Sequence, residues 1–294
     1  MPEGDNVWFQ ARLLQQALAG HRLTRCDIRV PRYATVDFTG SIVDSVQSRG
    51  KHLLIRVAGH VIHSQLKMEG TWQVYPAGPT VPATASGPPV RGARGHLTPS
   101  GQSWRRPAHT ARCILGTEHA TAVGFSLGLL EVIPQDQEAA AVGHLGPDLL
   151  GPDWDAGEAL RRLSALPERA VGLALLDQRN LAGIGNIYRN ELCFLAGVHP
   201  GAEVRVVADL PRMVDQAKRL LEANKDRTGR STTGGPARGD SALWVYRREG
   251  KPCKRCGALI RHGKLGEPVE PAQLRDIYFC PHCQPAPPAG WSPA

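Results

Sequence analysis

The sequence has no run of 18 or more apolar residues, so no segment predicts a transmembrane helix. Its first residues also lack the basic start and the apolar stretch that are typical of a secretory signal peptide, and we expect none. We find no internal repeat along the chain. These absences predict a cytoplasmic protein with no membrane partner.

The charge of the chain is positive and unevenly distributed. The 294 residues carry a formal net charge of +8, and the sequence pI is about 9.3. Between Lys218 and Lys264 there are 13 Lys or Arg residues against 4 Asp or Glu residues. Such clustering suits a nucleic acid, because basic side chains release counterions from a phosphate backbone. A solvated basic face is the alternative, since charge alone does not identify a partner.

Four of the seven cysteines form a metal-binding pattern. Cys253 and Cys256 make one C-x2-C pair, Cys280 and Cys283 make a second, and 23 residues separate the pairs. Four thiolates complete the tetrahedral coordination of one zinc ion, so we expect a structural and not a catalytic metal. The other three cysteines are isolated, and we expect them to be small buried residues.

The apolar pattern predicts an α+β protein. Helical spacing predicts a first helix over residues 6–19. Short segments rich in branched residues predict antiparallel strands at 23–30, 41–49, 52–59, 60–66, 71–75, 109–117 and 119–133. Helical patterns follow at 157–166, 170–177, 186–197 and 210–226.

These elements predict four regions along the chain. Residues 1–133 are expected to form a β-sandwich domain with a flanking N-terminal helix, interrupted by a flexible Pro- and Gly-rich stretch at about 77–103. Residues 134–150 are expected to be a connector, 151–243 a helical domain and 244–284 a zinc finger.

Proline at position 2 is a candidate nucleophile. A small second residue favours removal of Met1, which exposes the secondary amine of Pro2. An α-amino group has an unperturbed pKa of about 7.7–8.0, so a useful fraction is unprotonated near neutral pH. Such an amine can add to C1′ of a sugar and form an iminium, and the neighbouring Glu3 can shuttle protons. Because Met-Pro-Glu starts are common, this motif alone does not identify the chemistry.

Several motifs in order along the chain resemble one known family. They are Met1-Pro2-Glu3-Gly4, Arg49-Gly50-Lys51-His52-Leu53-Leu54, the segment Leu-Leu-Asp-Gln-x-x-Leu-Ala-Gly-Ile-Gly-Asn-Ile-Tyr at 175–188, and the terminal cysteine pairs. Together they look like the formamidopyrimidine-DNA glycosylase/endonuclease VIII family, in an actinobacterial-like form of the endonuclease VIII branch. The resemblance implies a helix-two-turn-helix element in the helical domain, and damaged double-stranded DNA as the partner of a nucleoid-associated monomer.

The resemblance also implies roles for individual residues. Pro2 matches the nucleophile that forms a Schiff base, Glu3 the acid that helps to open the sugar, and Lys51 the lysine of β-elimination. Arg275, in the zinc finger, matches an arginine that contacts phosphate and assists δ-elimination. Residues that match DNA contacts or their supports are Asn186, Gln65, Leu66 or Met68 as the filler of the gap left by a flipped base, His144 and Glu191.

The resemblance implies a bifunctional glycosylase and AP lyase of base excision repair that favours oxidised pyrimidines. The segment Gly124–Leu129 lacks the Arg and Phe wedge of the formamidopyrimidine branch at the matching places. Alternatives are a formamidopyrimidine-type enzyme that acts on 8-oxoguanine, a non-catalytic DNA-binding member of the fold, and a zinc-ribbon RNA-binding protein. Single-stranded or bubble DNA remains open as a further substrate.

Overall fold

The computed structural model describes residues 2–77, 96–97, 103–237, 239–267 and 274–285. The chain divides into two units. The sheet unit comprises Gln10–Ser48 and His52–Ala141, and the helical unit comprises Met1–Phe9, Arg49–Lys51 and Val142–Ala294. The finer segmentation into 1–133, 134–150, 151–243 and 244–284 stays a prediction.

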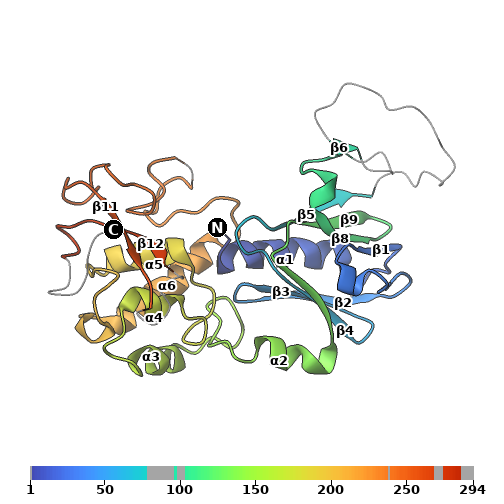
Figure 1. Ribbon diagram of the computed structural model, residues 1–294, viewed down its shortest axis with the longest axis horizontal. Coiled ribbons are helices and arrows are strands. Elements are labelled where there is room, and N and C mark those ends of the chain that lie inside the picture. Colours follow the sequence, from blue (N-terminus) through green and yellow to red (C-terminus); the bar gives the residue numbers. More distant parts are fainter. Residues whose placement is uncertain (1, 78–95, 98–102, 238, 268–273, 286–294) are drawn as a thin grey trace. The chain divides into compact units, whose positions relative to one another are not determined.

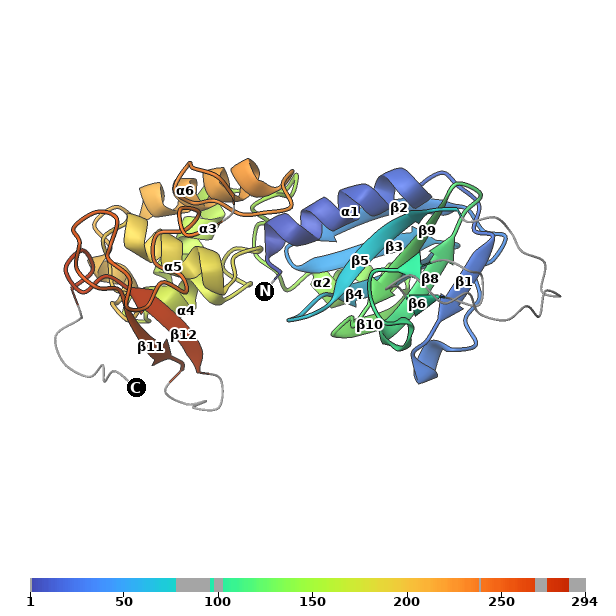
Figure 2. The same cartoon turned by 90° about the horizontal axis from the view of Figure 1, so that it is seen from above.

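The sheet unit contains two four-stranded antiparallel sheets (Figures 1 and 2). The first has the order β1 (Arg25–Ile28), β8 (Ala111–Gly116), β9 (Ala120–Phe125) and β5 (Thr71–Pro76). The second has the order β10 (Leu129–Pro134), β4 (His60–Gln65), β3 (His52–Val57) and β2 (Val43–Arg49). Each predicted strand segment overlaps an observed strand, and the last of them, 119–133, overlaps β9 and β10. The α+β prediction is confirmed.

Helix α1 (Gly4–Leu18) bonds to an edge strand of each sheet through its glutamines. The side-chain oxygen of Gln10 accepts a hydrogen bond of 2.6 Å from the amide of Trp72 in β5. That of Gln15 accepts one of 2.5 Å from the amide of Val46 in β2. Edge strands present unpaired amides, and these two side chains satisfy one on each sheet.

The helical unit holds α3 (Ala156–Ser164), α4 (Val171–Leu176), α5 (Asn186–Leu195) and α6 (Leu210–Asn224), followed by the hairpin of β11 (Arg261–Leu265) and β12 (Arg275–Phe279). Asp155 and Asp209 cap α3 and α6, because their carboxylates accept hydrogen bonds from amides in the first turn. The helices share a buried core that includes Leu163, Leu175 and Leu192. The helices expected from the sequence are therefore confirmed.

Some short elements were not expected. The predicted connector contains a 3-10 turn, η3 (Gln135–Gln137), and a helix, α2 (Glu138–Val142). Further 3-10 turns are η1 (Pro31–Tyr33), η2 (Ala108–Thr110) and η4 (Val204–Val206). Most of the predicted flexible stretch 77–103 lies outside the described residues, but β6 (His96–Leu97) and β7 (Ser103–Trp104) pair there. No helix in the described ranges is long and apolar enough to cross a bilayer.

Candidate active site

Glu3 is fully buried at the N-terminus of α5. Its carboxylate accepts hydrogen bonds from three backbone amides, those of Ile187 at 2.6 Å, Gly185 at 2.8 Å and Tyr188 at 3.3 Å. The first amides of a helix have no partner within the helix, and the helix dipole favours a negative charge there. The end of α5 therefore holds the Glu3 carboxylate in place, directly after Pro2 in the chain.

Two glycines of the turn before α5 permit this arrangement. A side chain at position 185 would place its Cβ 2.5 Å from both Cγ and Cδ of Glu3, which is too close for any residue but glycine. Gly183 has a φ of +114°, and its carbonyl accepts a hydrogen bond of 2.8 Å from the amide of Gly4. The Gly-Ile-Gly motif thus fastens the N-terminal residues of the chain to α5.

Lys51 is carried by a turn that Asp148 anchors. Asp148 is buried and accepts hydrogen bonds from the amides of Gly50 at 2.8 Å and Leu150 at 3.0 Å. Burial lowers the pKa of Lys51 to about 8; the carboxylate of Glu3 raises it, while the charges of Arg275 and Arg230 lower it further. Lys51 therefore titrates near neutral pH, and its charge responds to the charges of other predicted site residues.

The β11–β12 hairpin is fastened to the start of α5. The side-chain amide of Asn186 donates a hydrogen bond of 3.0 Å to the carbonyl of Asp276, the residue after Arg275. The guanidinium of Arg189 donates one of 2.8 Å to the same carbonyl and also bonds the side-chain oxygen of Asn186. The exposed Arg275 thus begins a strand whose next residue is bonded to the predicted phosphate-binding asparagine.

Arg189 is a residue that the sequence analysis missed. It is fully buried on α5, one helical turn after Asn186, and burial lowers its pKa to about 10. Among the described residues, nothing forms a hydrogen bond with its Nε or Nη1 atom. The signal in the sequence was a charged residue in an otherwise largely apolar helix, three positions after the asparagine.

A buried ion pair beside Glu3 was also missed. The guanidinium of Arg230 pairs with the buried carboxylate of Asp5, bonds the side chain of Asn6 at 2.8 Å, and lies 4.7 Å from the ring centre of Tyr188. Burial opposes the charge of Arg230, but the carboxylates of Glu3 and Asp5 outweigh it and raise the pKa of the guanidinium. The pair connects the segment after α6 to the N-terminal residues.

Glu191 holds the segment that leads into the cysteine cluster. It is fully buried on α5. Its carboxylate accepts hydrogen bonds from the amides of Trp244 at 2.7 Å and of Val245 and Tyr246 at 2.9 Å, and from the hydroxyl of Thr232. These contacts agree with the supporting role that the family resemblance implies for Glu191.

The four clustered cysteines can hold a metal ion. The sulfur atoms of Cys253, Cys256, Cys280 and Cys283 all lie within 4.8 Å of one another. The sulfurs of Cys253 and Cys283 are 4.0 Å apart, and those of Cys256 and Cys280 are 3.4 Å apart. A tetrahedron with metal–sulfur bonds of about 2.3 Å places its sulfurs roughly 3.8 Å apart, so the donor set fits a zinc ion.

The other predicted DNA contacts are Gln65, Leu66, Met68 and His144. Gln65 ends β4 in the sheet unit, and the two candidates for the gap filler differ in exposure. Leu66 is 1% exposed, whereas Met68 is 61% exposed. His144 is an exposed turn residue after α2.

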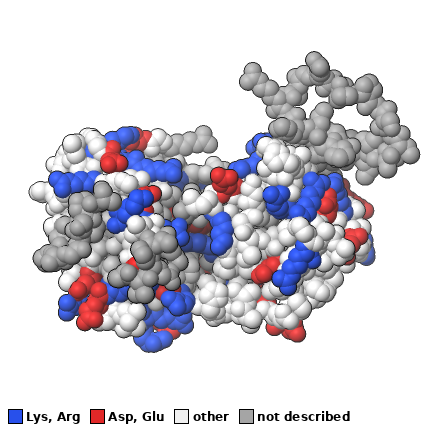
Figure 3. All heavy atoms as spheres, viewed as in Figure 1, with Lys and Arg blue, Asp and Glu red and all other residues white. Residues whose placement is uncertain are grey.

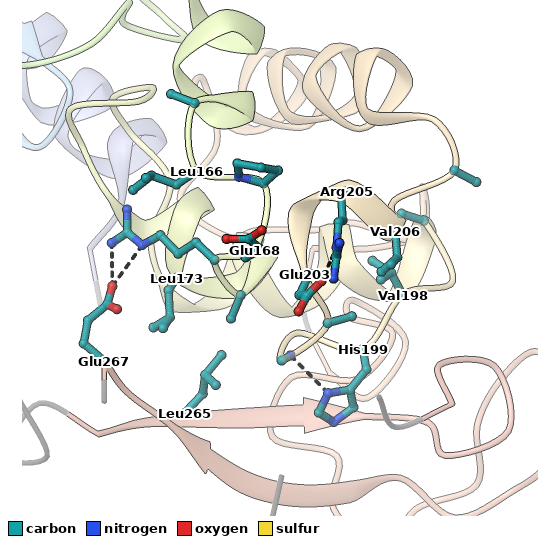
Figure 4. Close-up of a pocket in the computed structure, with 18 of the residues that line it drawn as sticks. Leu166, Glu168, Leu173, Val198, His199, Glu203, Arg205, Val206, Leu265 and Glu267 are labelled. Carbon is teal, nitrogen blue, oxygen red and sulfur yellow. Dashed lines mark hydrogen bonds and ion pairs between the residues drawn. The ribbon is translucent and has the colours of Figure 1, made fainter. Parts of the chain in front are cut away.

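A cavity of the helical unit is not lined by any predicted catalytic residue. It measures about 1400 Å³, and its lining includes residues 165–170, 196–199, 201–203 and 265–267 (Figure 4). Two pairs of its charged side chains are bonded, Arg169 with Glu267 at 2.6 Å and Arg205 with Glu203 at 2.5 Å. Several groups of Lys and Arg side chains, with fewer Asp and Glu side chains, lie on the face of the helical unit that Figure 3 shows. Such a surface suits a polyanion.

Models of two domains match the sequence. The formamidopyrimidine-DNA glycosylase N-terminal domain matches residues 1–122, and the formamidopyrimidine-DNA glycosylase H2TH domain matches residues 145–233. The chain is 50% identical to a probable endonuclease 8 2 of Streptomyces coelicolor, over 98% of this chain and 95% of that protein. It is 46% identical to the DNA-(apurinic or apyrimidinic site) lyase Nei2 of Mycolicibacterium smegmatis, over 97% of this chain and all of that protein.

More distant similarities extend to the other branch. The chain is 30% identical to a formamidopyrimidine-DNA glycosylase of Symbiobacterium thermophilum, over 98% of this chain and 90% of that protein. Among solved structures, the fold is similar to that of Lactococcus lactis Fpg in complex with an abasic site containing DNA, with a TM-score of 0.72 at 23% identity over 97% of this chain and all of that chain. The higher identity to the proteins named endonuclease 8 and Nei2 confirms the predicted branch.

Proposed function

Because this chain belongs to the formamidopyrimidine-DNA glycosylase family, we propose that it is a bifunctional DNA glycosylase and AP lyase of base excision repair. The observation that carries the proposal is the position of Glu3, held by three amides at the start of α5 directly beside Pro2. The partner is damaged DNA, which the basic surface of the helical unit suits (Figure 3).

The first half of the reaction forms a covalent intermediate. Removal of Met1 frees the amine of Pro2, which attacks C1′ of the damaged nucleotide. The bond between C1′ and the base breaks, and the base leaves with a proton. Glu3 accepts the proton that the Pro2 nitrogen loses on attack and passes it to the ring oxygen as the sugar opens, while the departing base takes its proton from water, which leaves an iminium that joins C1′ to Pro2.

The second half breaks the strand. The iminium acidifies the hydrogen atoms on C2′, and the neutral amine of Lys51 takes one of them. The bond from C3′ to its phosphate oxygen then breaks in β-elimination, and a further elimination releases the 5′ phosphate. Arg275 and Asn186 hold the phosphates through charge and hydrogen bonding. The lowered pKa of Lys51, about 8, supports its role as a base.

We assign one structural zinc ion to Cys253, Cys256, Cys280 and Cys283. Four thiolates leave no coordination position for a substrate, so the metal takes no part in the chemistry. It stabilises the finger, whose hairpin is in turn bonded to Asn186 and Arg189.

The proposed lesion class is oxidised pyrimidines, and Met68 is the proposed wedge. Base extrusion leaves a gap in the stack that an apolar side chain can fill. Met68 is exposed whereas Leu66 is buried. Phe125 is also fully buried and packs edge-on against Trp104 at 5.4 Å, so it is not available as the phenylalanine wedge of the other branch.

A borohydride trap tests the chemistry. The processed protein is incubated with duplexes that contain an abasic site or thymine glycol, reduced with borohydride, and scored for a covalent protein–DNA adduct. We expect an adduct through the free N-terminal amine, with a much lower yield in Pro2→Gly, whose primary amine replaces the proline nitrogen. Absence of the adduct from the unsubstituted protein on every duplex contradicts the mechanism. Excision rates on dihydrouracil and 8-oxoguanine, in duplex, bubble and single-stranded DNA, determine the lesion class.

A further inference from the structure

A polar cluster on three neighbouring strands of the sheet unit has no part in the proposed chemistry. It consists of His52, His63 and Glu131, which lie on β3, β4 and β10. Figure 2 labels these three strands. Register places Glu131 opposite His63 and places His52 opposite Gln65, the last residue of β4. His52 is 7% exposed and His63 is 2% exposed, so both rings are held inside the protein. Two adjacent buried imidazoles are costly unless each of them is hydrogen-bonded.

The cluster forms a continuous chain of contacts that ends at Gln65. An oxygen of the Glu131 carboxylate lies 2.7 Å from Nδ1 of His63. Nε2 of His63 lies 2.8 Å from Nδ1 of His52, and the two rings are nearly parallel, with an interplanar angle of 6°. The side-chain nitrogen of Gln65 lies 3.3 Å from both ring nitrogens of His52.

An ionised carboxylate at one end and neutral imidazole rings together define one direction for the bonds of the chain. An ionised carboxylate only accepts, so Nδ1 of His63 carries a proton. In a neutral ring Nε2 of His63 is then an acceptor, and it takes the proton on Nδ1 of His52. That leaves Nε2 of His52 as an acceptor, which attracts the amino group of Gln65 and repels its carbonyl oxygen. Among the described residues, the backbone carbonyl oxygen of Gln65 accepts a hydrogen bond from the amide of Gly128, whereas its side-chain oxygen accepts none.

We propose that Glu131, His63 and His52 are positioning residues that orient the side-chain amide of Gln65, so that it offers its carbonyl oxygen to the base opposite the lesion. This inference rests on the proposed function and on the role of Gln65 as a DNA contact, which the family resemblance implies. A hydrogen-bond acceptor there favours guanine, whose N1–H and N2–H groups are adjacent donors, over adenine, whose corresponding edge pairs one donor with one acceptor. Since a single hydrogen bond contributes about 1 kcal/mol, the expected preference is about fivefold.

The inference is tested by binding, which does not depend on catalysis. Dissociation constants are measured for duplexes with a tetrahydrofuran abasic analogue opposite guanine or adenine. We expect the unsubstituted protein to bind the guanine duplex about fivefold more tightly. Glu131→Gln, whose amide accepts or donates, loses this preference, and Glu131→Asp, which keeps a carboxylate, retains part of it. Glu138→Gln is the matched control, because Glu138 pairs with Arg56 in the same unit and has no contact with Gln65.

A double-mutant cycle separates orientation of Gln65 from a general structural role. In a Gln65→Ala background, Glu131→Gln is expected to change neither dissociation constant, because the residue that it orients is gone. An equal effect of Glu131→Gln with and without Gln65 overturns the proposal, as does a guanine preference that survives Glu131→Gln. If the protein binds these duplexes with the expected preference but cleaves no damaged DNA, the proposed function fails and the orientation of Gln65 stands.

Discussion

The carboxylate of Glu3 lies at the first turn of α5, where it accepts a hydrogen bond of 2.6 Å from the amide of Ile187. These two residues are far apart in sequence, and the contact holds the proposed proton donor next to Pro2, the proposed nucleophile. The position of Glu3 at the start of α5 is therefore expected to influence the reaction of Pro2.

Glu3→Gln is expected to slow base release by about 10²- to 10⁴-fold, because an amide cannot transfer a proton to the sugar oxygen. Strand cleavage at a preformed abasic site, where no base must leave, is expected to fall much less. Single-turnover rates on the two substrates measure the difference. Glu118→Gln, at an exposed turn, is the control. Equal losses on both substrates would argue against an acid role in base release.

Gly185→Ala tests whether the position of Glu3 matters apart from its charge. The added Cβ would lie 2.5 Å from Cγ and Cδ of Glu3, so the carboxylate must move away from the amides of α5. We expect base release to fall while Glu3 itself is unchanged. Gly157→Ala, at an exposed position of α3, is the matched control, and we expect it to leave the rate unaltered. A Gly185→Ala enzyme with normal base release would contradict the prediction.

The rate of strand cleavage is expected to rise with pH and to level off above about pH 8, because only the neutral amine of Lys51 accepts a proton. Lys51→Arg keeps the charge and removes this step, and borohydride trapping reports the titration of Pro2 separately. The contribution of Lys51 to the stability of the protein also rises with pH. The folded pKa lies below the ordinary value of 10.5, so the unfolded chain binds more protons between pH 8 and 10.5, and the contribution of Lys51 to the free energy of unfolding rises with pH there.

Arg230→Met is expected to lower the free energy of unfolding by about 3–5 kcal/mol, because it leaves the buried carboxylate of Asp5 without its partner. Denaturant unfolding measures this cost. Arg219→Met is the control, since Arg219 pairs with Asp215 on the exposed face of α6 and its loss costs about 0–1 kcal/mol. Similar costs for the two variants would contradict the importance of the buried pair.

Met68→Ala and Leu66→Ala are expected to separate function from stability. The exposed Met68 contributes little to folding, so its truncation should weaken binding to abasic-analogue duplexes with a change in stability within about 0.5 kcal/mol. The buried Leu66 should cost about 2–5 kcal/mol of stability. Thermal melts and dissociation constants give both values. If Leu66→Ala alone weakens binding in a fully folded protein, Leu66 and not Met68 fills the gap.

Cys256→Ser is expected to remove the zinc ion and with it the DNA affinity that depends on Arg275, because the hairpin needs the metal for its folding. Metal content per chain and dissociation constants are the measurements. Cys26→Ser, outside the cluster, should leave both unchanged. Full zinc content in Cys256→Ser would show that the four cysteines are not the ligand set.

The sequence by itself determined the regular elements and the metal pattern. Strand and helix patterns are local, so short segments rich in branched residues at β3 and β4 and helical spacing along α6 were sufficient to predict those elements. The C-x2-C pairs predicted the metal site equally well, because each pair supplies two ligands from neighbouring residues. Short elements such as α2 were missed, since five residues carry too little periodicity.

Only the tertiary structure decided which distant groups meet. Nothing in the motif Met-Pro-Glu indicates that Glu3 lies against the amides of α5, or that Asp5 is paired with Arg230. The contacts of Arg189 and the chain from Glu131 to Gln65 could not be predicted for the same reason, because their partners come from separate helices and strands. Burial, which lowers the pKa of Lys51, is likewise a property of the packed protein, and the sequence alone carries no measure of it.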